Sequence, residues 1–313
     1  MAMENENIKR LRLKIIMNPS SGRELARTNV EDMLAYLSGQ GALERADICY
    51  TAGPFDATRF AENMKADEYD YVVCVGGDGT VNEVITGIMN ASHNIPLAIY
   101  TCGTVNDFAT SLGMPSEPSD FARMLMNPKL IKTDCGKVND RYFLNVLAAG
   151  LLTDVAYKVP SELKTALGQV AYWIEGLKDL QDINNTIPLQ IESNGEVHDI
   201  DAVFFFISNS QSVGGFKKLM IQAQMNDGLL DVLVLSKVKY SDVIPLLGKL
   251  ALGEHLESDQ VLYFQTNELA ITTSSKTPVT LDLDGEMGPN LPANISCIKD
   301  ALTLVIPNEE EDL

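Results

Sequence analysis

The first 113 residues alternate between short apolar runs and stripes of apolar residues at helical spacing. Residues 71–75 form one continuous apolar run, which is typical of a strand buried on both faces. Further strand-like runs lie at 9–17, 46–50 and 95–100. Helical segments separate the runs, at 24–37, 55–64 and 81–89. Strands that alternate with helices in this way predict parallel βαβ units.

Beyond about residue 130 the pattern changes to short strand-like runs separated by turns. Turn signals such as Ser193-Asn194-Gly195 and Asn226-Asp227-Gly228 punctuate this region, and helical inserts are expected at 163–180 and 242–252. Short strands with regular turn signals predict a mostly antiparallel sandwich or split barrel. The runs are 143–147, 189–192, 202–208, 229–235, 262–266, 269–272, 279–283 and 302–306.

These two patterns predict an α/β domain followed by a mostly-β domain. A parallel α/β nucleotide-binding domain is expected over residues 8–130, and an antiparallel β-sandwich-like domain over 131–300. The pattern leaves open whether the last segment, 300–313, returns to the first domain.

The stretch Gly76-Gly77-Asp78-Gly79-Thr80 joins the buried run at 71–75 to the helical stripe that follows it. Backbone N–H groups beside a helix N-terminus bind anions, and glycines let the backbone approach a phosphate closely. Asp78 repels a phosphate unless a metal, a sugar hydroxyl or an adenine edge lies between them, so the stretch predicts a nucleotide–metal site. The alternative is a tight turn in which Asp78 caps the helix. The pattern matches neither a Walker A loop nor a dinucleotide fingerprint.

Three polar loops that contain glycine follow predicted parallel strands, at 18–22, 76–80 and 101–107. The carboxyl ends of parallel strands meet at one edge of a sheet, where ligands bind in open α/β folds. We therefore expect these loops to lie together.

A second candidate site is the acidic stretch Leu281-Asp282-Leu283-Asp284-Gly285-Glu286. Alternation along a strand places Asp282 and Asp284 on one face and the leucines on the other. Carboxylates at a strand end can bind a cation or act as a general base. The alternative is a surface hairpin with acidic residues.

Composition and charge exclude several classes of protein. The formal net charge of −19 argues against a nucleic-acid-binding protein and against strong adsorption to anionic lipid. No apolar run approaches the ~18 residues that a membrane-spanning helix needs, and residues 1–10 lack the apolar core of a signal peptide. The five scattered cysteines contain no CxxC pair, which favours free thiols in a reducing cytoplasm.

Six stretches in order along the chain resemble one family, the diacylglycerol kinase catalytic-domain superfamily in its soluble bacterial lipid-kinase branch. The matching stretches run from residue 18 to residue 286: Asn18-Pro19-Ser20-Ser21-Gly22, Val75 to Glu83, Gly103 to Ala109, Asn145 to Gly150, Asn226 to Asp231 and Leu283 to Glu286. The glycine stretch alone is shared with NAD kinases and phosphofructokinases, whereas the ordered set is specific.

The resemblance implies an ATP-dependent kinase that phosphorylates a lipid hydroxyl with Mg²⁺, in a cleft between its two domains. It implies that Asp284, Glu286 or both supply the general base, with Glu286 favoured. It also implies a structural Mg²⁺ site at Gln224, Asp227 and the carbonyl of Leu229, where a plain hairpin turn is the alternative. The implied nucleotide contacts are Thr51, Gly76, Gly77, Asp78, Gly79, Thr80, Val81, Asn82 and Thr104.

Two departures from the family pattern accompany the resemblance. Thr101-Cys102 stands where a proline-containing approach is more usual, and Gln222-Ala223-Gln224 departs from the usual spelling before the Asp-Gly turn. The second departure weakens the assignment of the metal ligands.

The acceptor stays open among diacylglycerol, phosphatidylglycerol, sphingoid bases and other lipid alcohols. A cytoplasmic enzyme that touches the membrane surface transiently is expected, and a homodimer stays open. The alternatives are a kinase of a soluble acceptor, such as an NAD kinase, and a non-catalytic nucleotide-binding regulatory protein. Asn106 to Ala109 and the ending Leu283 to Glu286 favour the lipid branch.

Overall fold

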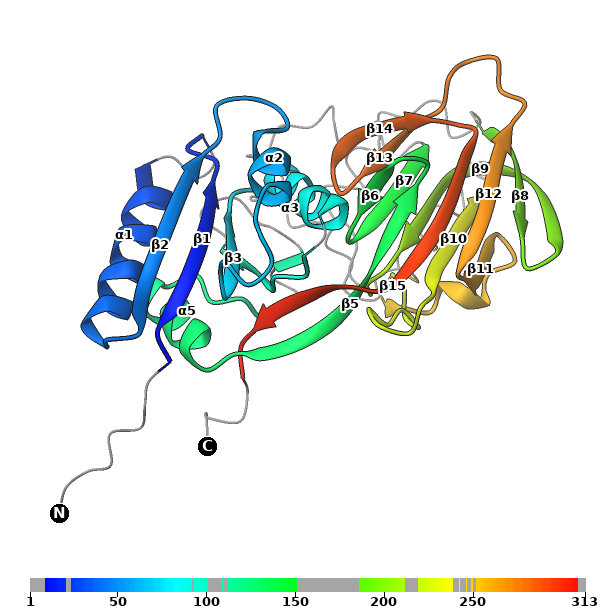
Figure 1. Ribbon diagram of the computed structural model, residues 1–313. Coiled ribbons are helices and arrows are strands. Elements are labelled where there is room, and N and C mark those ends of the chain that lie inside the picture. The colour runs from blue at the N-terminus through cyan, green and yellow to red at the C-terminus, as the bar shows by residue number, and fades with distance from the viewer. Residues whose placement is uncertain are drawn as a thin grey trace. The chain divides into compact units, whose positions relative to one another are not determined.

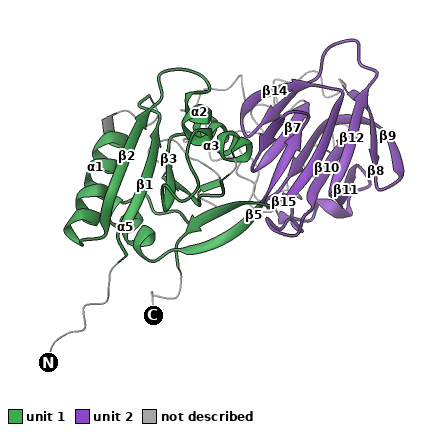
Figure 2. Ribbon diagram, in the orientation of Figure 1, with its two compact units in different colours: residues 1–133, 300–313 green, residues 134–299 purple. Residues whose placement is uncertain are grey.

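The computed structural model (Figure 1) describes two compact units, one of residues 1–133 and 300–313 and the other of residues 134–299, which Figure 2 colours separately. The predicted loop at 101–107 with Thr104, the helical insert at 163–180 and most of the insert at 242–252 lie outside the described residues. The described residues are 9–20, 24–91, 93–100, 108–109, 112–150, 186–211, 219–238, 242, 246, 249 and 252–308.

The first unit contains a parallel sheet, as the alternation of strands and helices predicts. The order of its strands is β2, β1, β3 and β4, and each neighbouring pair is parallel. The strands are β1 (Leu11–Met17), β2 (Leu43–Tyr50), β3 (Tyr71–Val75) and β4 (Leu97–Tyr100). The predicted α/β class of this region is confirmed.

Helices cover this sheet on both faces (Figure 1). Alternate residues of the central strands, such as Leu13 and Val73, pack in one core with α1 (Glu24–Gly39) and α5 (Pro118–Met126). Helices α2 (Asp56–Glu62) and α3 (Asp78–Asn90) lie on the other side. Strand β3 is buried at every position because it has a neighbouring strand on each edge and helices on each face.

The second unit is antiparallel throughout the pairings that the described residues make, which confirms the predicted β-sandwich-like class. Its strand order is β14, β13, β7, β9, β8, β12, β15, and β9 also pairs with β10, which pairs with β11. Leu147, Phe205, Val232, Ile271 and Leu281 belong to its shared core.

These strands have the following bounds: β6 (Arg141–Phe143), β7 (Val146–Gly150), β8 (Ile187–Ser193), β9 (Glu196–Ser208), β10 (Leu230–Ser236), β11 (Val261–Thr266), β12 (Glu268–Thr273), β13 (Thr280–Leu283) and β14 (Glu286–Asn290). A single 3₁₀ turn, His255–Glu257, precedes β11.

Two strands contain the points where the chain passes from one unit to the other. They are β5 (Lys129–Val138) and β15 (Ala293–Ile306), and they pair with each other. The first part of β15 pairs antiparallel with β12, whereas Leu304 near its end pairs in parallel with Leu97 of β4. The last strand therefore joins the sheet of the first unit, a point that the sequence left open.

Within the described part of the chain, none of the helices combines the length and the apolar character that crossing a bilayer needs.

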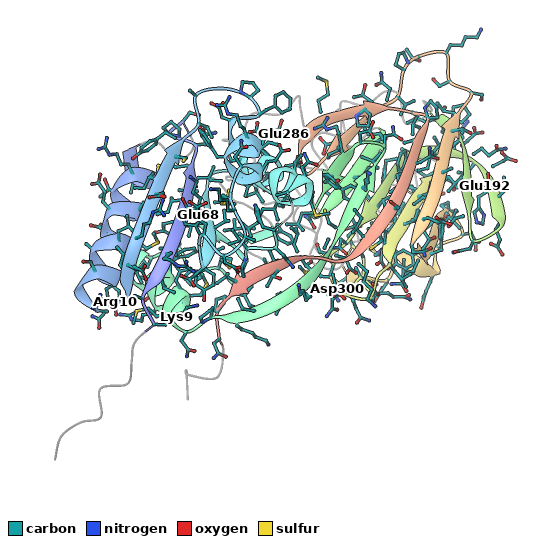
Figure 3. All side chains as sticks on the ribbon, viewed as in Figure 1. Lys9, Arg10, Glu68, Glu192, Glu286 and Asp300 are labelled. Atoms are coloured by element: carbon teal, nitrogen blue, oxygen red, sulfur yellow. The ribbon has the colours of Figure 1, made fainter. Side chains whose placement is uncertain are left out.

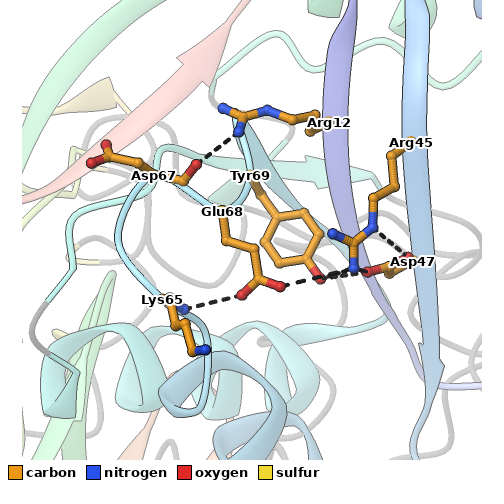
Figure 4. A network of polar contacts seen from close by, with 7 residues as sticks. All are labelled: Arg12, Arg45, Asp47, Lys65, Asp67, Glu68 and Tyr69. Atoms are coloured by element: carbon orange, nitrogen blue, oxygen red, sulfur yellow. Dashed lines mark hydrogen bonds and ion pairs between the residues drawn. The ribbon is translucent and has the colours of Figure 1, made fainter.

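A polar network links the edge strand β2 to the segment just before β3 (Figure 4). The hydroxyl of Tyr69 donates to Asp47 at 2.5 Å, and Arg45 forms an ion pair with the same carboxylate. Hydrogen bonds from Arg45 and Tyr69 lower the pKa of Asp47, and desolvation followed by the Asp47 bond raises the pKa of Tyr69. Charged side chains on an edge strand also oppose pairing with the sheet of another molecule.

We predict that Tyr69→Phe lowers the free energy of unfolding by about 1 kcal/mol, because Asp47 loses one donor but keeps Arg45. Chemical denaturation of the variant checks this value. Tyr71→Phe is the matched control, since this buried tyrosine's hydroxyl makes no side-chain hydrogen bond with the described residues. Equal destabilisation by the two changes would mean that the Tyr69 bond contributes nothing specific.

Candidate functional site

The glycine stretch forms the predicted turn between β3 and α3. Helix α3 begins at Asp78, and its N-cap is Gly77, with φ −85° and ψ −174° and no side-chain hydrogen bond to the helix. Asp78 is exposed in the first helical turn and does not occupy the cap position. The N-cap residue therefore provides no side chain to cover the first N–H groups of the helix. This arrangement suits the binding of an anion.

Gly76 is required by the tightness of this turn. A Cβ atom at this position would lie 2.6 Å from the Cβ atom of Thr80, well inside contact distance. Thr80, Val81 and Asn82 are buried at the start of α3, whereas Asp78 faces solvent. Among the predicted nucleotide-binding residues, Thr80 to Asn82 are therefore buried in the helix, and Asp78 is exposed to solvent.

Hydrogen bonds tie the loop after β1 to this turn, and they tie the segment after β2 to the end of β1. The Asn18 side chain donates from Nδ2 to the hydroxyl of Thr80 at 3.3 Å, and its backbone N–H donates to the carbonyl of Val75 at 2.9 Å. The N–H of Thr51 donates to the carbonyl of Met17 at 2.9 Å. Asn18 was not predicted as a site residue. Its position in the loop at 18–22, which was expected to lie beside the glycine turn, could have indicated this contact.

The acidic stretch forms a tight hairpin between β13 and β14. Asp284 and Gly285 both have positive φ angles, 53° and 89°, as a two-residue type I′ turn requires. The expectation that Asp282 and Asp284 share a strand face is wrong, because β13 ends at Leu283 and the backbone turns at Asp284. Asp282 accepts the N–H of Gly285 at 2.9 Å across this turn.

The carboxylate of Asp284 holds a loop that is distant in sequence. Its oxygens accept the N–H groups of Leu144 at 2.8 Å, Asn145 at 2.9 Å and Val146 at 2.8 Å. The Asp284 N–H in turn donates to the carbonyl of Val146 at 2.9 Å. Asp284 therefore fixes the start of β7 against the hairpin.

Glu286 occupies a different environment two residues later. It is the first residue of β14, it is exposed, and it is labelled in Figure 3. Among the described residues, no side-chain hydrogen bond or ion pair engages its carboxylate. Arg141 donates to the carbonyl of the next residue, Met287, at 2.6 Å, and so holds β14 in place. Asp282 and Asp284 of this hairpin thus accept backbone N–H groups, whereas Glu286 is exposed.

The predicted metal ligands lie around the turn before β10. Asp227 accepts the N–H of Leu229 at 2.9 Å, and Asp134 accepts the N–H of Gly228 at 2.6 Å, whereas Gln224 is exposed. Burial, and then the carboxylates of Asp134 and Asp227, raise the pKa of the Cys297 thiol to about 12.

The oxygen chemistry of this turn suits Mg²⁺. The described residues nevertheless gather no group of three acidic, cysteine or histidine side chains that could hold a metal. The set Gln224, Asp227 and Leu229 stays a prediction.

Comparison with known proteins gives matches along nearly the whole chain. Residues 12–138 match the diacylglycerol kinase catalytic domain, and residues 145–306 match the YegS C-terminal NAD kinase beta sandwich-like domain.

A diacylglycerol kinase of Bacillus subtilis (strain 168) is 34% identical over 302 residues, which cover 96% of this chain and 98% of that protein. A diacylglycerol kinase of Staphylococcus aureus (strain JH9) is 35% identical over 300 residues, with 96% and 94% covered. A solved diacylglycerol kinase structure from Bacillus anthracis strain Sterne superposes with a TM-score of 0.76 at 25% identity, over 95% of this chain and 98% of that chain.

We predict that Asp284→Ala lowers the free energy of unfolding by about 2–4 kcal/mol, because three backbone donors lose their acceptor. Asp282→Ala removes a contact at the exposed end of the same hairpin and should cost much less. Chemical denaturation of both variants separates the two cases. A loss of similar, small size in both would contradict the role given to Asp284.

Proposed function

The chain belongs to the diacylglycerol kinase family of lipid kinases, and we propose that it transfers the γ-phosphate of ATP to the free hydroxyl of diacylglycerol. In this reaction the acceptor oxygen bonds to the γ-phosphorus, and the bond from that phosphorus to the β–γ bridging oxygen breaks. The hydroxyl proton passes to a carboxylate of the enzyme. The products are phosphatidic acid and ADP.

The assignment of the base rests on one observation, the contrast between the carboxylates of Asp284 and Glu286. Asp284 already accepts three N–H groups, so its oxygens serve the fold. Glu286 is exposed and has no side-chain partner among the described residues. A general base needs a lone pair that can reach the substrate proton. We therefore propose Glu286 as the base and Asp284 as the residue that holds the hairpin.

The nucleotide is proposed to bind at the start of α3. Gly76 to Asn82 provide N–H groups there, the helix has no side-chain cap at Gly77, and the turn leaves no room for a Cβ at residue 76. Thr51 and Thr104 are the further proposed contacts. Phosphoryl transfer relies on positioning and on neutralising the phosphate charge, so these donors supply what the reaction needs.

Mg²⁺, bound with ATP, would neutralise the phosphate oxygens during transfer. Asp78 is the proposed oxygen ligand for this ion, because its carboxylate is exposed in the first turn of α3 beside the proposed phosphate site. This role also accounts for a carboxylate in a loop that is otherwise suited to an anion.

Contact with the lipid is proposed to be local and apolar, because a net charge of −19 disfavours adsorption to anionic lipid. Met287, the residue after Glu286, has 73% of its surface exposed and offers an apolar contact for an acyl chain beside the proposed base.

We place the enzyme in the cytoplasm with transient membrane contact, and the free thiols of Cys49, Cys74, Cys135 and Cys297 support a reducing compartment. Homodimer formation stays open, and light scattering of the purified chain checks it.

A soluble acceptor is the second candidate, because residues 145–306 match an NAD kinase beta sandwich-like domain. We expect ADP formation with Mg²⁺-ATP and diacylglycerol, and none with NAD. Phosphatidylglycerol, sphingosine and ceramide are tested as further lipid acceptors in the same assay. Turnover on NAD together with silence on every lipid would overturn the proposal.

We predict that Glu286→Gln lowers kcat on diacylglycerol by roughly 10²- to 10⁴-fold, because the amide cannot accept the hydroxyl proton. The KM for ATP should change little, since Glu286 is not proposed to contact the nucleotide. Glu268→Gln, at an exposed position of β12, is the control and should behave as the unmodified enzyme. Full activity of Glu286→Gln would show that another group takes the proton.

A further inference from the structure

Glu83 on α3 reaches across to the beginning of α2. Its Oε1 accepts the N–H of Phe55 at 2.9 Å, and its Oε2 accepts the N–H of Ala57 at 3.1 Å. The partners lie 28 and 26 residues earlier in the chain. Both oxygens of one carboxylate are thus used at one end of a short helix.

The beginning of α2 needs an acceptor from outside. Its N-cap residue is Phe55, which has a left-handed backbone with φ 64° and makes no side-chain cap hydrogen bond. The nearby acid, Asp56, turns its carboxylate back to the N–H groups of Ala52 at 2.8 Å and Gly53 at 3.1 Å. Glu83 therefore takes the place of the missing cap.

Other contacts hold α2 closely against α3. The hydroxyl of Thr58 donates to the backbone carbonyl of Glu83 at 3.0 Å. The helices also approach closely at Gly87, where a Cβ atom would lie 2.3 Å from the carbonyl oxygen of Thr58. The hydrogen bonds of the Glu83 carboxylate also attach the end of the loop that precedes α2 to α3.

This loop and the glycine turn both contain residues proposed to bind the nucleotide. Thr51 begins the segment that leads into α2, and the glycine turn begins α3, five residues before Glu83. We propose that Glu83 is a positioning residue that holds residues 51–55 beside the glycine turn, so that both contact one nucleotide. This inference rests on the nucleotide site of the proposed function.

Glu83 acts through backbone groups and does not itself contact the nucleotide. The other hydrogen bonds that tie these loops join neutral groups: Asn18 to Thr80 at 3.3 Å, and the N–H of Thr51 to the carbonyl of Met17 at 2.9 Å. Hydrogen bonds to a carboxylate are shorter and stronger than neutral ones. Loss of the Glu83 carboxylate should therefore release the loop at 51–55 more than the loss of any neutral contact.

The test compares Glu83→Ala and Glu83→Gln with Glu62→Ala, a control at an exposed position at the end of α2. Steady-state assays vary ATP and diacylglycerol separately. We expect Glu83→Ala to raise the KM for ATP about tenfold and to leave the KM for diacylglycerol within about twofold. Glu83→Gln should recover part of the loss, because its amide oxygen still accepts one N–H group.

A purely structural role gives a different result. If both KM values rise by the same factor, or if the KM for ATP is unchanged, the inference is wrong. Calorimetric titration with Mg²⁺ and a non-hydrolysable ATP analogue separates this inference from the proposed lipid reaction. An unmodified enzyme that binds the analogue without phosphorylating lipid overturns only the reaction. Weaker binding by Glu83→Gln, which keeps the side-chain volume, then supports the inference even if Glu83→Ala does not fold.

Discussion

The loops of this protein depend on carboxylates that accept backbone N–H groups from residues distant in sequence. Buried or partly buried N–H groups in turns must find an acceptor, and leaving one without a partner costs about 1–3 kcal/mol. Asp284 serves residues 144–146, Glu83 serves the start of α2, Asp70 serves Arg12, and Asp134 serves Gly228. Part of the large acidic content therefore has a structural use, and the net charge of −19 is not only a property of the surface.

This constraint separates two kinds of carboxylate among the residues proposed for function. Asp284 and Glu83 are committed to the backbone, so they fix loops and are poor candidates for proton or metal chemistry. Asp78 and Glu286 are exposed, one in the first turn of α3 and one at the start of β14. In our proposal Asp284 and Glu83 each hold a loop in shape, Asp78 meets Mg²⁺-ATP, and Glu286 meets the lipid hydroxyl.

The sequence predicts what is local and misses what depends on long-range contacts. Periodicity identifies the parallel strands, the antiparallel strands and the glycine turn because each leaves a repeating pattern over a few residues. Alternation wrongly placed Asp284 on the strand face of Asp282, because the alternating pattern continues to Asp284 while the backbone turns there. The partners of Asp284 lie about 140 residues away, so no local pattern could assign its role. Glu83 escaped notice for the same reason. The apolar run at the end of β15 fits either sheet, and only its pairing with β4 decides between them.

The most direct test of the account follows the phosphate itself. The enzyme is incubated with Mg²⁺ and ATP labelled at the γ-phosphate, together with diacylglycerol in mixed micelles, and the lipid fraction is extracted and separated. The account predicts that the label appears in phosphatidic acid, in an amount equal to the ADP formed. Label found only in inorganic phosphate, or only in a soluble product when NAD is present, would contradict it.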